Sequence, residues 1–217
     1  MTLSPTRRST LGRKRDRAAT DRAALHAVLD EGLVAHVAFV RDGAPVVLPT
    51  GYGRDGDTLY LHGSTGARWL AGADLPCCVT VTHLDGIVHA RALMHFSMNY
   101  RSAVVHGTAR RVTGDAERLH ALRVIVEHLA PGAWDHARTP DRRELAATAV
   151  LALDLTEASV KSRSGPPSDD DADVAADLAW AGVVPLRTVA GTPEPAPDLQ
   201  GHREVPAHVR DVRHTGG

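Results

Sequence analysis

Three short stretches of the sequence carry side chains that could bind or transform a ligand. The first is YLHGSTGAR at residues 60–68, where glycines, hydroxyl groups and one guanidinium follow an apolar run. If a strand ends there and a helix begins, free backbone N–H groups would lie beside these side chains, a setting that suits a phosphate. The Gly-Lys-Ser/Thr ending of a P-loop is missing, and a capped turn with a surface arginine explains the same residues.

The second stretch, HFSMNYRS at residues 95–102, stands between two predicted strands and consists mostly of polar or ionisable side chains. A hairpin needs only a short turn, so a long turn with these residues predicts a functional loop. The third stretch is KSRSG at residues 161–165, with Trp180 further along the chain. The indole either closes the mouth of a barrel or forms one wall of a site for a planar ligand.

Motifs for hydrolysis or for a bound metal ion are missing. The chain has no GxSxG elbow, HExxH pair or paired-carboxylate signature, and its 13 histidines do not recur in HxH or HxxxH pairs. Codon bias explains the abundance of histidine better than metal binding does, and no metal site is predicted. Cys77 and Cys78 are adjacent, which gives neither a CxxC pair nor a long-loop disulfide and indicates a reducing compartment.

The elements that must position these stretches are mostly strands. A helix is predicted from a cap at Thr20-Asp21 to Gly32 as its C′ stop, a short one at 67–73, and a third between Gly114 and Pro131. The third helix has one predicted apolar face, formed by Leu119, Leu122, Val126 and Leu129. Strands are predicted at 33–40, 44–52 and 58–62, as an antiparallel meander, and at 76–81, 87–93, 102–112 and 148–155. A turn is predicted at Asp85-Gly86 and a bulge at Gly107.

So many short strands predict a mainly β fold with flanking helices, arranged as a closed or partly closed antiparallel barrel. The 217 residues suffice for one domain with tails. We expect a basic, solvated N-terminal arm (1–19), one domain (20–190) and a disordered C-terminal tail (191–217), because the tail is Pro-rich, polar and without periodicity.

Composition narrows the class of protein. Lys and Arg number 25 and Asp and Glu 26, so the surplus of cations that a general nucleic-acid binder needs is absent. Aromatic residues are only 4% of the chain, which argues against a stacking platform for single strands. No apolar run approaches the ~18 residues that span a bilayer, and the basic N-terminus lacks the apolar core of a secretory signal. We therefore expect a cytoplasmic protein with no nucleic-acid or membrane partner.

Several segments taken together resemble one known family. The most specific is THLDGIVHARALMHFSMNYRSAVVHGTARRV (82–112), and the others are LDEGLVAHVAFVRDGAPVVLPTGYG (29–53), LYLHGSTGARWL (59–70), EHLAPGAWDHARTPDRRELAAT (127–148), KSRSGPPSDDDAD (161–173) and WAGVVPL (180–186). They resemble the pyridoxamine 5'-phosphate oxidase-like FMN-binding split-barrel family, and within it the nitroimidazole-resistance group. The resemblance implies an antiparallel split β-barrel and a homodimer with FMN at the subunit interface.

The same resemblance assigns residues to the flavin. The strand at 46–50 would run along the ring through its backbone, with Leu48, Pro49 and Thr50 as contacts. The phosphate end or the ring edge would be held by His62, Gly63, Ser64, Thr65 and Arg68, and His62 is the candidate catalytic residue. A neighbouring strand, in part from the partner subunit, would contribute Asn99, Tyr100, Arg101 and Ser102, and Trp180 would wall the site. Relatives often place a lysine in the phosphate segment, where Arg68 is the only cation here.

The resemblance implies an FMN-dependent oxidoreductase that acts on a small molecule, with a nicotinamide cofactor as electron source. The substrate-phosphate arginines of true pyridoxamine-phosphate oxidases are missing near the C-terminus, which argues against pyridoxal phosphate synthesis. Two alternatives stay open. The first is a split barrel that binds haem or a deazaflavin cofactor, which the absorption spectrum of the purified protein would reveal. The second is a non-catalytic flavin-binding protein, which would hold flavin without reduction by nicotinamide.

Overall fold

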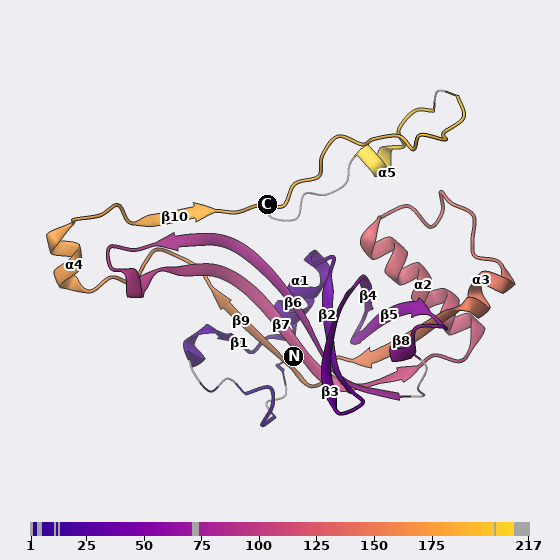
Figure 1. Ribbon diagram of the computed structural model, residues 1–217, viewed down its shortest axis with the longest axis horizontal. Helices are drawn as coiled ribbons and strands as arrows, with labels where there is room; N and C mark the ends of the chain where they lie inside the picture. Colours follow the sequence, from indigo (N-terminus) through magenta and orange to yellow (C-terminus); the bar gives the residue numbers. More distant parts are fainter. Residues whose placement is uncertain are drawn as a thin grey trace.

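The sheet of this chain joins strands that are far apart in the sequence. The computed structural model describes residues 2–3, 6–10, 12, 14–70, 74–201 and 203–210. In this part of the chain the strands form one ten-stranded antiparallel sheet whose main path is β3-β2-β6-β7-β8-β5-β4 (Figure 1). These strands are β2 (Ala35–Arg41), β3 (Ala44–Thr50), β4 (Tyr52–Asp55), β5 (Thr58–Ser64), β6 (Asp74–His89), β7 (Ser97–Arg111) and β8 (Thr148–Asp154). Off the path, β1 (Ala18–Ala19) pairs with β9 (Ala158–Arg163), β9 also pairs with β7, and β10 (Gly182–Pro185) pairs with β6.

The two terminal strands of the main path, β3 and β4, are consecutive in the sequence. β3 ends at Thr50 and β4 begins at Tyr52, so Gly51 alone separates the terminal strands. The sheet must curl until its edges approach each other, although no ladder joins β3 to β4. The result is the open, antiparallel split barrel that the sequence predicts. The meander predicted over residues 33–62 is wrong, because its middle strand breaks at Gly51 and the two halves lie at opposite ends of the sheet.

β6 and β7 pair along their length and extend beyond the barrel (Figure 1). We call residues 84–102, with the turn η3 (Leu93–His95) at the tip, the β6–β7 arm. The turn predicted at Asp85-Gly86 is wrong, because β6 continues through these residues with an irregularity in register between Leu84 and Gly86. A Cβ at Gly86 would lie 3.0 Å from the carbonyl oxygen of Val184, so glycine lets β10 approach the arm.

β7 also differs from its prediction in two respects, its first residue and the expected bulge. β7 begins at Ser97 rather than at 102, so most of the predicted functional loop belongs to a strand. The bulge predicted at Gly107 is absent, since this residue pairs in register with Cys77. A Cβ at Gly107 would lie 2.7 Å from Cδ1 of Leu153. Glycine therefore lets the Leu153 side chain pack closely against β7 at this point.

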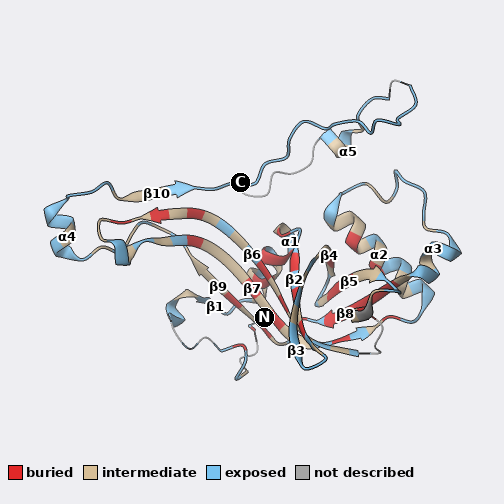
Figure 2. Ribbon diagram, in the orientation of Figure 1, coloured by how far each residue is buried: buried red, intermediate tan, exposed pale blue. Residues whose placement is uncertain are grey.

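The barrel encloses the larger core, to which α1 (Arg22–Glu31) contributes (Figure 2). Its Asp21 cap accepts a hydrogen bond from the N–H of Ala23, as predicted from the sequence. The buried side chains of this core come from α1 and from strands on every side of the barrel, among them Leu25, Leu29, Val37, Leu61, Val105 and Leu153. The helix ends before Gly32, but this glycine has a φ of −77° and is no left-handed stop. It is needed because a Cβ there would lie 2.4 Å from Cγ1 of Val81.

α2 (Asp115–Leu129) and α3 (Arg142–Ala147) cover the strands at the opposite side, where a second, smaller core forms. The buried residues of α2 are Ala121 and Ile125, while Leu119 and Leu129 are 38% and 41% exposed. The predicted apolar face is therefore only partly correct, because Leu122 packs against this core whereas Leu119 and Leu129 are exposed. Gly53 explains which face of α2 is buried, because a Cβ at this position would lie 2.7 Å from the backbone oxygen of Val124. The helix backbone, rather than its leucines, approaches the sheet closely at this point.

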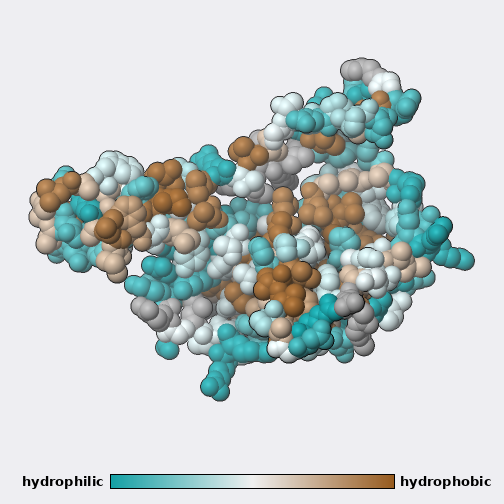
Figure 3. Space-filling model, viewed as in Figure 1, coloured by the Kyte–Doolittle hydropathy of each residue, from teal (hydrophilic) through white to brown (hydrophobic). Residues whose placement is uncertain are grey.

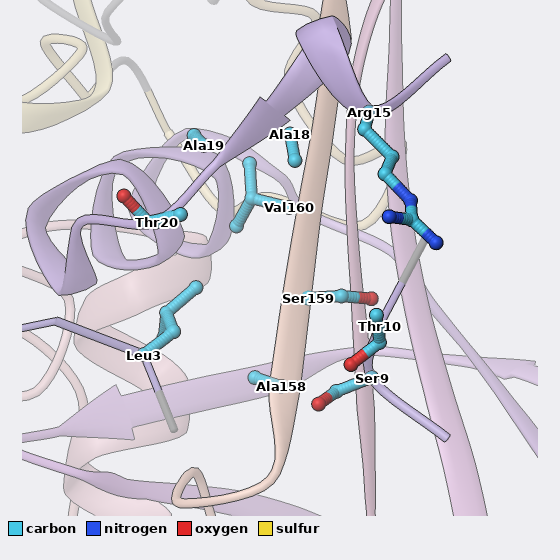
Figure 4. A pocket seen from close by; sticks show the side chains of 10 residues that line it. All are labelled: Leu3, Ser9, Thr10, Arg15, Ala18, Ala19, Thr20, Ala158, Ser159 and Val160. Atoms are coloured by element: carbon cyan, nitrogen blue, oxygen red, sulfur yellow. The ribbon is translucent and has the colours of Figure 1, made fainter. Parts of the chain in front are cut away.

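Both ends of the described chain return to the domain. β1 of the N-terminal arm pairs with β9, and Leu3 is buried in the larger core, so the expectation of a solvated arm is wrong for these residues. A cavity of about 200 Å³ remains between this arm and β9, lined mainly by apolar atoms (Figure 4). In the tail, α5 (Ala207–Arg210) places the ring of His208 4.8 Å from that of His136. Among the described residues no helix is long and apolar enough to cross a membrane.

Candidate functional site

The end of β3 is joined through Gly51 to β4, which pairs with β5. β4 and β5 pair so that Tyr52 lies opposite Leu61. Because Thr50 precedes Tyr52 by two residues and Gly63 follows Leu61 by two, Thr50 and Gly63 fall at the same level of this hairpin. Two predicted groups of cofactor-binding residues therefore lie on strands that are joined through β4, namely Leu48, Pro49 and Thr50 on β3 and His62, Gly63, Ser64 and Thr65 at and just after the end of β5. We call this region the β5 end.

His62 is the chemically unusual residue of the β5 end. Its Nδ1 is buried and has no hydrogen-bond partner in the described part of the chain. Burial lowers the pKa of the imidazole below its usual value of 6.5, so the ring is neutral at pH 7. A buried polar atom without a partner destabilises a fold by about 1–3 kcal/mol, which makes such atoms rare. A neutral imidazole nitrogen in this position can donate to or accept from a bound molecule.

The segment after His62 is a turn with an exposed backbone. Ser64 Oγ accepts a hydrogen bond of 3.1 Å from the N–H of Gly66, and the N–H of Thr65 donates to the carbonyl of Ala147 at 2.9 Å. The short helix predicted at 67–73 is only the 3₁₀ turn η2 (Arg68–Leu70) in the described residues, and residues 71–73 lie outside them. The side chain of Arg68 also lies outside what the structure describes. The backbone nevertheless places this turn beside the β5 end.

The predicted loop residues Asn99, Arg101 and Ser102 have structural partners in the same chain. Asn99 donates from Nδ2 to the carbonyl of Gly165 at 3.2 Å and accepts from Arg163. Ser102 Oγ donates to the carbonyl of Lys161 at 3.3 Å. These bonds tie β7 to β9 and to the segment that follows it. The polar character of this stretch therefore reflects strand cross-linking in the single chain.

Arg101 joins three elements. Its guanidinium donates to both carboxylate oxygens of Glu31, at the end of α1, and to Asp85 of β6 at 2.7 and 3.0 Å. The hydrogen bond from Arg101 lowers the pKa of Glu31, and the carboxylates raise the pKa of the guanidinium. This network links β6 and β7 to the end of α1 at the base of the arm.

Within one chain, the β6–β7 arm lies far from the β5 end. Arg110 of β7 pairs with Ala152 of β8, which in turn pairs with Tyr60 of β5. Ser102 precedes Arg110 by 8 residues (110 − 102), about 26 Å at roughly 3.3 Å per residue. Trp180 is 67% exposed and lies against His89 on the arm, with ring centroids 5.6 Å apart. The structure thus separates the predicted site residues into two groups.

The sequence gives no signal for two arginines that stand beside the β5 end. Arg111 and Arg118 line a cavity of about 190 Å³ together with Thr65. In the sequence Arg111 is one of two adjacent arginines in a strand, and Arg118 is one of several charged residues in a helix. Only the pairing of β7 with β8 and the position of α2 bring them next to Thr65.

Comparisons with known proteins agree with this fold. A family model described as pyridoxamine 5'-phosphate oxidase matches residues 21–162. A solved structure described as the FAD and heme binding protein from Mycobacterium smegmatis is 41% identical, with a TM-score of 0.88 over 93% of this chain and 100% of that one. The flavocytochrome Anf3 from Azotobacter vinelandii is 37% identical, with a TM-score of 0.90 over 97% of this chain and 99% of that one. A search of curated proteins found no match.

A more distant structure supports the fold alone. It is described as a putative 5-nitroimidazole antibiotic resistance protein from Bacteroides thetaiotaomicron, and it is 19% identical with a TM-score of 0.56. The alignment covers 66% of this chain and 85% of that one. Since the family model spans most of the barrel and the first two structures align over nearly the whole chain, the protein belongs to the pyridoxamine 5'-phosphate oxidase family of split barrels.

Proposed function

We propose that this protein is a flavin-dependent oxidoreductase whose flavin binds at the β5 end. The observation that carries the proposal is the buried Nδ1 of His62, which lacks a partner in the described part of the chain. A flavin ring edge, with its carbonyl oxygens and ring nitrogens, would supply that partner. The two similar proteins named for FAD, heme or a flavocytochrome support a flavin here as well. When bound, the flavin supplies the capacity to accept and donate two electrons.

The residues of this chain would bind and orient that group. The backbone of Leu48, Pro49 and Thr50 would follow the ring. Neutral His62 would hydrogen-bond the ring edge and hold or accept a proton at Nδ1. The exposed turn of Ser64 and Thr65, with Arg68, would face the phosphate end. FMN, which the sequence resemblance implies, and FAD share this riboflavin phosphate unit, so the same residues would serve either nucleotide.

The test combines a spectrum with turnover. The purified protein should carry, or take up from solution, a flavin that heat or acid releases for identification as FMN or FAD by chromatography. Anaerobic addition of NADH or NADPH should then bleach the flavin absorption. Nicotinamide would bind transiently over the flavin, since the chain has no GxGxxG fingerprint. Tight flavin binding without bleaching by either nucleotide would favour the non-catalytic alternative. An absorption spectrum typical of a deazaflavin would show that this cofactor, rather than a flavin, is bound.

A homodimer is the second part of the proposal. Several large apolar side chains of the arm and of the segment beside it are solvent-exposed, and hydrophobic surface gathers there (Figure 3): Leu84, Leu93, Met94, Phe96, Met98 and Trp180. Such a patch on a protruding hairpin is typical of a subunit interface. A partner's arm could also bring its own copies of Tyr100 and Trp180 to the β5 end, which the single chain cannot do. Light scattering at micromolar concentration should give the dimer mass, and Phe96→Asp should lower it to that of a monomer.

A haem group is a second candidate ligand. The ring of His89 packs against those of Phe96 and Trp180, at 5.3 and 5.6 Å, within this apolar surface. An imidazole with apolar surroundings is what a haem iron and its porphyrin require. The name of the Mycobacterium smegmatis protein, which is 41% identical, includes heme beside FAD. A Soret band in the purified protein that His89→Ala abolishes would support this ligand, and a band unaffected by that variant would exclude His89 as the iron ligand.

A further inference from the structure

The cavity between Thr65, the end of β7, the first turn of α2 and the junction of α3 with β8 has the chemistry of an anion site. Its walls are formed by Thr65, Arg111, Val112, Thr113, Arg118, Ala146, Thr148 and Ala149. Two arginines and three threonines therefore contribute to the walls of a space of about 190 Å³, and one of the hydroxyl groups, that of Thr148, already donates to the carbonyl of Glu144 at 2.9 Å. Asp115 lies 3.1 Å from Nη1 of Arg118, but its carboxylate is 78% exposed, so the balance of charge at the walls is positive.

Donors remain unused in this cavity. Arg111 donates from Nη1 to the carbonyl of Leu70 at 2.6 Å, while its Nε and Nη2 have no hydrogen-bond partner in the described part of the chain. The hydroxyl groups of Thr65 and Thr113 likewise have none there. Arg118 is held by the carbonyls of Leu145 and Thr148, which fixes its guanidinium at the wall. The unused donors of Arg111, Thr65 and Thr113, beside the fixed positive charge of Arg118, are groups of the kind that bind a phosphate.

The cavity also adjoins the proposed flavin site. Thr65 belongs both to its lining and to the β5 end, three residues after His62. The bond from Arg111 to Leu70 ties the cavity to the turn that carries Arg68. We propose that the cavity lined by Arg111, Arg118 and Thr65 binds the phosphate end of the flavin nucleotide. This inference rests on the proposed flavin site and assigns the phosphate to arginines of β7 and α2, beyond the 64–68 segment.

The test compares ligands that differ only in phosphate. Riboflavin, FMN and FAD are titrated by fluorescence into the full-length wild type, Arg111→Gln and Arg110→Gln at one ionic strength. Arg110 is the matched control, because it is the adjacent arginine of β7 and pairs with Glu117 at the surface. Loss of a charge-assisted bond should weaken FMN and FAD about ten- to a hundredfold in Arg111→Gln and leave riboflavin within about twofold. Equal FMN affinities in the two variants would overturn the assignment.

A second variant guards against misfolding of Arg111→Gln, which also loses the bond to Leu70. Thr65 is exposed and its structural bond is made by its backbone, so Thr65→Glu should fold. Its carboxylate would repel phosphate and lower FMN affinity without changing that for riboflavin, and unchanged FMN affinity would count against the proposal. If the wild type binds no flavin at all, the proposed function fails. Pyrophosphate then tests the cavity by itself: an Arg111-dependent rise in the thermal midpoint supports an anion site, and no rise overturns it.

Discussion

The β5 end and the β6–β7 arm are both rich in polar side chains, but they differ in whether these side chains have hydrogen-bond partners. On the arm, Asn99, Arg101 and Ser102 each bond to groups of the same chain. At the β5 end, a buried nitrogen of His62 has no such partner within the described residues. A polar stretch that satisfies itself holds the fold together, whereas a buried polar atom left without a partner points to something bound. What the arm offers to a partner in the proposed dimer is therefore its exposed apolar surface rather than these three polar side chains.

The largest expected effect tests the structural role of the arm. Arg101→Ala would leave the carboxylates of Glu31 and Asp85 facing each other without a cation. We expect the free energy of unfolding to fall by about 2–3 kcal/mol, since these groups are only partly exposed. Urea denaturation of the purified protein measures this loss. Arg138→Ala is the control, because its ion pair with Glu144 is exposed to solvent and should contribute far less to the free energy of unfolding. Equal losses in the two variants would show that the network does not hold the arm.

The next effect tests the β5 end and has the opposite sign. His62→Leu removes a buried polar atom that lacks a partner, so the flavin-free protein should gain about 1 kcal/mol of stability. The thermal midpoint should then rise by roughly 2–4 °C for a chain of this size. Flavin affinity should fall by up to about tenfold, the equivalent of one hydrogen bond. A variant that is less stable without flavin, with flavin affinity unchanged, would contradict the role assigned to His62.

The pH dependence of stability is a second test of the burial of His62. The folded-state pKa of His62 is lower than the unfolded value near 6.5, so between these two values the unfolded chain binds more protons. Stability is therefore fully present above about pH 6.5 and is lost as the pH falls toward the folded-state pKa. Subtracting the profile of His62→Leu from that of the wild type removes the contribution of the other histidines. A difference that does not change between pH 7 and pH 5 would show that His62 titrates normally.

The smallest expected effect concerns the tail, which belongs to neither region. Deletion of residues 191–217 removes the contact between the rings of His208 and His136 and little buried surface. We expect a loss below about 1 kcal/mol, or roughly 2–4 °C in the thermal midpoint, with flavin affinity intact. Calorimetry and flavin titration of the shortened chain measure both. Loss of a bound chromophore would instead place the tail at the ligand site, and His208→Ala would show whether that ring is responsible.

Local features of the sequence predicted local structure well. Asp21 caps α1 as expected, and Asp42-Gly43 makes the β2–β3 turn with φ values of 50° and 78°, the left-handed conformation these residues tolerate. The family resemblance also gave the split barrel. These outcomes depend on neighbouring residues or on a motif as a whole. They do not require knowledge of which strand lies beside which.

The failures all involve contacts between distant residues. Asp85-Gly86 has the same turn signal as Asp42-Gly43, but the ladder with β7 and the bond from Arg101 to Asp85 keep β6 extended through it. Gly32, Gly53 and Gly107 are glycines because another part of the chain lies where a Cβ would be. The buried face of α2 follows from that same close approach.

The sequence by itself therefore determined the family, the strand-rich class and His62 as the residue to examine. Only the tertiary structure decided that Asn99 and Arg101 bond to groups of the same chain, and that Arg111 and Arg118 meet Thr65 at a cavity. The physical reason is that backbone preference and capping act over a few residues, whereas burial and hydrogen-bond partners depend on the path of the whole chain. A side chain's type is written in the sequence, but whether its donors and acceptors are already used is a property of the folded sheet.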